Sequence, residues 1–112
     1  MPITPEFAEL IDRLKQELNQ TEQQATKGLN RTRDLLSLFS DNAILLETYT
    51  FLNATQLFIE NSRRQVQKAV EFVSLTTVSN EEVQEAGEEL GTLLGKTLEV
   101  KLRIERIVNR LE

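Results

Sequence analysis

The sequence predicts an all-α protein, an elongated antiparallel (up-down-up) three-helix bundle with coiled-coil-like heptad packing. Apolar or small residues recur at alternating steps of four and three along most of the chain, which is the spacing of one helix face. Proline occurs only at positions 2 and 5, so no strong helix breaker follows. Short clusters of cap- and turn-forming residues divide the rest into segments of similar length, and short connections favour antiparallel neighbours.

The first predicted helix covers residues 5–39. Thr4 followed by Pro5 and Glu6 is typical of an N-cap, a proline at the first helical position and an acid near the positive end of the dipole. Between Asn19 and Lys27 the segment is almost wholly polar, so a break that turns three helices into four is the alternative. The predicted core positions are Phe7, Ile11, Leu14, Leu18, Thr21, Ala25, Gly28, Thr32, Leu35 and Phe39.

The second predicted helix covers residues 43–75 and follows the turn-forming segment 40–42. It carries three neighbouring heptad stripes, and such a wide apolar arc is typical of a helix with partners on two sides. The first stripe is large (Leu45, Leu52, Ile59, Val66, Val73), the second is small (Thr48, Thr55, Ser62, Ala69), and the third holds Ile44, Phe51, Phe58 and Phe72.

The third predicted helix covers residues 80–111 and begins with a capping box, in which Ser79 and Glu82 satisfy each other's backbone amides. Its first turns are acidic and its last turns are basic, which complements the helix dipole. The predicted core positions are Val83, Ala86, Leu90, Leu93, Thr97, Val100, Ile104, Ile107 and Leu111.

Residues 1–112 are expected to form a single domain, and the composition argues against an enzyme. The chain has no cysteine and no histidine, so it lacks a thiol nucleophile, the commonest metal ligand and the commonest general base. The glutamates of residues 81–89 suggest a metal site, but the solvated start of a helix explains them better. We therefore expect no catalytic, cofactor-binding or metal-binding residue.

The charge and hydropathy patterns exclude further classes of function. The formal charge of −5 gives no general attraction to nucleic acid, and nucleic-acid binding is not expected. The longest apolar run is Ala43–Leu46, far short of the roughly 20 residues of a membrane span. Residues 1–7 show no export signal, so a cytoplasmic protein is expected.

A candidate interface lies in the third helix, where Gly87, Gly91 and Gly95 recur every four residues. A glycine inside a helix costs about 0.5–1 kcal/mol relative to alanine, and none of these glycines ends the helix. Gly91, Gly95, Leu98 and Leu102 lie outside the core stripe and form a second line along the helix. We predict that they pack against another chain, or else against a larger share of their own bundle than three helices allow. The alternative is that the glycines are tolerated and the leucines partly covered.

Two further features could form a binding site. The small core residues of the first two helices could surround a ligand cavity or an oligomer interface, or their hydroxyls could bond back to their own helices. Arginines gather at one end of an up-down-up bundle, where they could meet phosphate or an acidic partner, or only balance helix dipoles. The predicted basic end consists of Arg31, Arg33, Arg103, Arg106 and Arg110.

These observations predict a non-enzymatic protein–protein interaction module, a small scaffold or adaptor. Its partners are expected to be copies of itself, which makes a homo-oligomer, or another helical protein. The physical basis is that the second helix is apolar over a wide arc and the third carries a second apolar stripe. The alternative function is a helical bundle that binds an apolar small molecule or a lipid chain in its small-residue centre.

Overall fold

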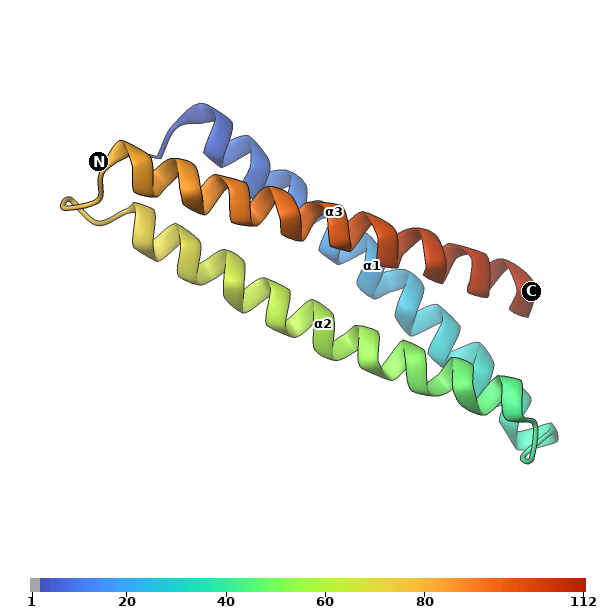
Figure 1. Ribbon diagram of the computed structural model, residues 1–112. Coiled ribbons are helices and arrows are strands. Elements are labelled where there is room, and N and C mark those ends of the chain that lie inside the picture. The colour runs from blue at the N-terminus through green and yellow to red at the C-terminus, as the bar shows by residue number, and fades with distance from the viewer. Residues whose placement is uncertain (1–2) are drawn as a thin grey trace.

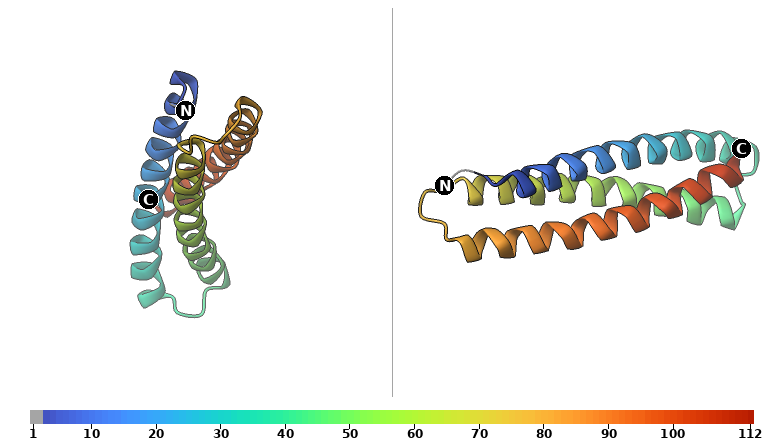
Figure 2. Two further views of the ribbon diagram at one scale, coloured as in Figure 1. Left: turned by 90° about the vertical axis from the view of Figure 1, so that its left-hand side faces the viewer. Right: turned by 90° about the horizontal axis from the view of Figure 1, so that it is seen from above.

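The computed structural model describes residues 3–112, so Met1 and Pro2, the start of the stretch considered above for an export signal, lie outside the described residues. Helix α1 spans Pro5–Leu38, α2 spans Ala43–Val73 and α3 spans Asn80–Leu111. The three lie side by side, with the connections at opposite ends and α2 running against α1 and α3 (Figures 1 and 2). The predicted up-down-up bundle is confirmed, and its Cα atoms extend over 57 × 18 × 16 Å.

Each helix begins at a polar cap. The Thr4 hydroxyl accepts a hydrogen bond from the Phe7 amide at 3.2 Å, and the Asn42 side chain accepts one from the Leu45 amide at 3.0 Å. At the start of α3, Ser79 and Glu82 form the predicted capping box. These caps satisfy amides that have no partner within the helix, and they fix where each helix starts.

Helix α1 is unbroken through its polar stretch. Thr21 is buried, and its hydroxyl donates to the Glu17 carbonyl at 2.7 Å instead of capping a new helix. Neighbouring polar side chains contact the other two helices: Glu17 accepts from Lys101 of α3 and Glu22 from Arg63 of α2. Tertiary contacts therefore keep this segment helical, although its sequence alone also allowed a break in the helix.

The heptad pattern correctly predicts most of the core. Eight of the ten core positions predicted in the first helix are buried, from Phe7 to Thr32. The prediction that Phe39 belongs to the core is wrong. Its side chain is 56% exposed, because α1 ends at Leu38 and Phe39 is its C-cap. Leu29 and Val108 are buried although they lie outside the predicted stripes.

Gly28 marks a close approach of the helices. A Cβ atom at this position would lie 3.0 Å from Cδ1 of Leu52 in α2 and 3.4 Å from Cγ2 of Val108 in α3. The missing side chain therefore lets α1 pack closely against both other helices at this level. Around it lies a buried cluster of Ala25, Leu29, Leu52, Ile104 and Val108.

Helices α2 and α3 pack mainly against α1 and much less against each other. In Figure 1, α1 lies behind the other two helices, and α2 and α3 lie in front of it. We call the line along which α2 and α3 face each other the open seam. A closed three-helix bundle would have three comparable interfaces, whereas this one has two and the open seam.

Truncating Leu52 to alanine is expected to lower the free energy of unfolding by about 2–5 kcal/mol, because this fully buried side chain would leave a cavity. Leu57→Ala on the same helix removes an exposed side chain and should change stability by about 0.5 kcal/mol or less. Urea denaturation of both variants measures the difference. Equal losses would contradict the described packing of α2.

Candidate interaction surfaces

The predicted interface stripe lies on the outer face of α3. Positions Gly91 and Gly95 are open, since no atom lies within 4 Å of where a Cβ would be. Leu98 is half-buried and Leu102 is 55% exposed. The stripe is therefore accessible at both ends, and its role as an interface stays a prediction.

Most of the small residues at the bundle centre are buried, and the hydroxyls among them bond to their own helices; Thr48 and Ala69 are only partly buried. Thr32 donates to the Gly28 carbonyl at 2.7 Å, and Thr97 donates to the Leu93 carbonyl at 2.8 Å. Thr55 and Ser62 of α2 do the same toward the carbonyls four residues before them. Within residues 3–112 no buried side-chain polar atom lacks a hydrogen-bond partner. The centre thus offers a ligand no unsatisfied polar group.

The predicted basic end divides into two groups. On one side Arg31 donates to the Leu111 carbonyl at 3.1 Å, at the C-terminus of α3. Arg33 lies 5.8 Å from the ring centroid of Tyr49 in α2, and its hydrogen bond lowers the pKa of that hydroxyl, followed by the effect of Asn53. These arginines serve contacts between helices. The other three, Arg103, Arg106 and Arg110, lie along the open seam.

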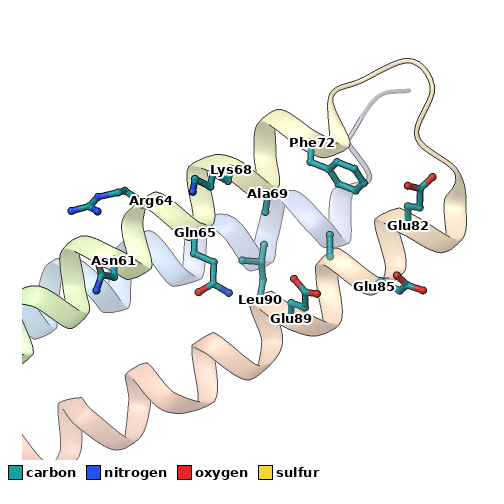
Figure 3. A pocket seen from close by; sticks show the side chains of 11 residues that line it. Asn61, Arg64, Gln65, Lys68, Ala69, Phe72, Glu82, Glu85, Glu89 and Leu90 are labelled. Carbon is teal, nitrogen blue, oxygen red and sulfur yellow. The ribbon is translucent and has the colours of Figure 1, made fainter.

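The first hollow of the open seam lies near the connection between α2 and α3 (Figure 3) and has a volume of about 590 Å³. We call it the glutamate groove. Its floor is apolar, and charged side chains of opposite sign rise from its two banks, α2 and α3. The lining residues are Asn61, Arg64, Gln65, Lys68, Ala69, Phe72, Glu82, Glu85, Ala86, Glu89 and Leu90.

The banks of the glutamate groove do not neutralise each other. Among the described residues no ion pair within 4 Å joins Arg64 or Lys68 to the glutamates of α3. Arg64 approaches only Glu60 of its own helix, at 3.9 Å. Phe72 at the loop end is 39% exposed. The groove therefore combines uncovered apolar surface with unpaired charge.

The second hollow lies toward the other end of the seam and measures about 410 Å³. We call it the arginine groove. The Arg103 guanidinium stacks over the Phe51 ring at 4.1 Å from its centroid, and Ile44 at the rim is 74% exposed. The lining residues are Ile44, Glu47, Thr48, Phe51, Arg103, Arg106, Ile107 and Arg110. Here α2 supplies the acid and α3 the bases, the reverse of the glutamate groove.

Within residues 3–112 the acidic side chains form no cluster of three that would suit a metal ion. None of the three described helices contains an apolar stretch of membrane-spanning length.

Comparison with protein-family models, with curated proteins and with solved structures finds no significant match to this chain.

The two grooves were not predicted from the sequence. The stripe that contains Ile44, Phe51, Phe58 and Phe72 was recognised as an apolar flank, but a flank is exposed only if the neighbouring helix stays away. The sequence did not indicate that Glu47, Arg64 and Lys68 line a groove, since single charges on a polar helix face are ordinary. Their alternation of sign with the charges of α3 becomes visible only when the two helices are placed side by side.

The pair of Glu22 and Arg63 predicts a small effect of pH on stability. The Arg63 hydrogen bond holds the pKa of Glu22 below its ordinary value of 4.5. A lowered carboxyl pKa stabilises the fold above the unfolded-state pKa, and this contribution is lost as the pH falls through the lowered value. Glu22→Gln should therefore lose less stability than the wild type when urea denaturation is compared at pH 7 and pH 3. Because both side chains are more than one third exposed, we expect the difference to be small, and identical losses in the two proteins would contradict it.

Proposed function

We propose that this chain is a non-enzymatic protein–protein interaction module, a small scaffold that self-associates through its helical faces. The open seam carries this proposal. It leaves Ile44 and Phe72 partly uncovered at opposite ends of α2, and large apolar side chains lined up along one face favour burial against another protein.

The chemistry of the surface supports binding rather than catalysis. The arginines and glutamates of the seam lie on long exposed helix faces, without the buried, convergent arrangement on which general acid–base or nucleophilic catalysis depends. An apolar floor between charged banks is instead the usual design of a groove that accepts a helix. A helical partner is therefore the class of ligand that fits.

The mass in solution tests this proposal. Light scattering after size exclusion, with the protein at about 1–100 μM, should give a multiple of 12.9 kDa that grows with concentration. Leu98→Glu, measured beside the wild type, shows whether the α3 stripe takes part, because a charge there would prevent burial. A mass of 12.9 kDa throughout the range would contradict self-association.

A further inference from the structure

Building on the proposed function, we infer that the open seam is covered by a second copy of this chain in an antiparallel twofold dimer. Its axis crosses the helices near Phe58 of α2 and Lys96 of α3. A stripe of side chains on each of these two helices determines both the partner and the register in which the two copies align.

The stripe on α3 is charged and changes sign at its centre. Glu82, Glu89, Lys96, Arg103 and Arg110 follow one another at intervals of seven residues, so they share one face of the helix. The glutamates line the glutamate groove and the outer two arginines line the arginine groove. Reversing this stripe about Lys96 places every glutamate opposite an arginine of the copy.

The stripe on α2 is mostly apolar and is centred in the same way. Ile44, Phe51, Phe58, Gln65 and Phe72 also follow at intervals of seven residues. Reversal about Phe58 sets Ile44 against Phe72 of the copy, so the exposed apolar side chains at the two ends of this stripe would bury each other. Phe58 then meets its own copy at the axis.

The two centres lie at the same level of the molecule. Arg103 stacks on Phe51, and one heptad along the antiparallel helices brings Lys96 beside Phe58. One twofold axis therefore serves both stripes. A twofold contact joins a surface to itself, and here the charges and the apolar residues satisfy that condition in a single register.

Flanking charges follow the same register. Glu85 precedes Lys96 by 11 residues and Arg106 follows it by 10, so they face each other across the axis. On α2, Glu47 precedes Phe58 by 11 residues and Lys68 follows it by 10. The pairing also brings Lys96 toward its own copy, and the exposed Glu99 of each chain, three residues along, offsets this like-charge approach.

Other twofold pairings are less complementary. An axis along the helices would lay α2 on α3 of the copy and press Phe72 against Glu82, which desolvates a charge against an apolar ring. Antiparallel pairing of the outer stripe, with Gly91 opposite Leu102, would place Glu88 against Glu105 of the copy, a like-charge contact. The seam is the surface that matches itself.

Complementary charge reversals test the pairing. Glu85→Arg with Glu89→Arg gives one variant, and Arg103→Glu with Arg106→Glu gives the other; both leave the capping residue Glu82 in place. Each variant alone should dimerise about tenfold or more weakly than the wild type, because like charges face each other. An equimolar mixture should recover a heterodimer, measured by sedimentation velocity, since every altered side chain on one α3 helix then faces an opposite charge on the other.

The matched control for the first variant is Glu9→Arg with Asp12→Arg, which makes the same charge change as Glu85→Arg with Glu89→Arg, on exposed positions of α1, and should dimerise like the wild type. Circular dichroism checks that every variant is folded. The inference is overturned if the reversed variants still dimerise, or if their mixture stays monomeric while the control dimerises. If Leu98→Glu is then the variant that gives monomers, the proposed function stands with the stripe as interface, whereas a monomeric wild type removes both.

Discussion

Helix α1 packs closely against both other helices, and the arrangement of α2 and α3 follows from this packing. At Gly28 the backbone of α1 lies so close to Leu52 of α2 and Val108 of α3 that a Cβ atom there would be in tight contact with both side chains. One continuous stripe of α1 thus serves two partners. Because α2 and α3 are each held to α1, they need not close on each other, and the open seam is the direct consequence.

Polar groups complete this packing without breaking it. The buried hydroxyls donate to carbonyls of their own helices, so they impose no partner between helices and allow close approach. Specific pairing comes instead from two polar bridges: Lys101 binds Glu17 and Gln20 of α1, and Arg63 binds Glu22. The side chains of Lys101 and Glu17 are mostly covered, whereas those of Arg63 and Glu22 are more exposed. Both bridges lie within or directly before the polar stretch of α1, so they link this part of α1 to its neighbours and keep the helix continuous.

Most of the fold was predictable because helix periodicity records which face is buried. The heptad of α1 predicted its core as far as Thr32 and failed at Phe39, where the helix has already ended and no neighbour covers the ring. The interaction surface was less predictable. The sequence shows that Ile44 and Phe72 share a face, but their exposure depends on how far α3 lies from α2, a tertiary property. The charges of α3 are ordered symmetrically about Lys96, but this order indicates a twofold pairing only because Lys96 lies beside Phe58, the centre of the α2 stripe.

If a second copy closes the open seam, a single thiol placed at the twofold axis will link the two chains. The chain has no cysteine, so Lys96→Cys creates a unique thiol at the twofold axis. Mild oxidation under native conditions should link two chains through a disulfide, because antiparallel pairing through the seam face of α3 brings this position to its own copy within the roughly 4–7 Å between Cα atoms that a disulfide allows. A folded variant that shows no linked dimer, at concentrations where the wild type is dimeric, would contradict the pairing.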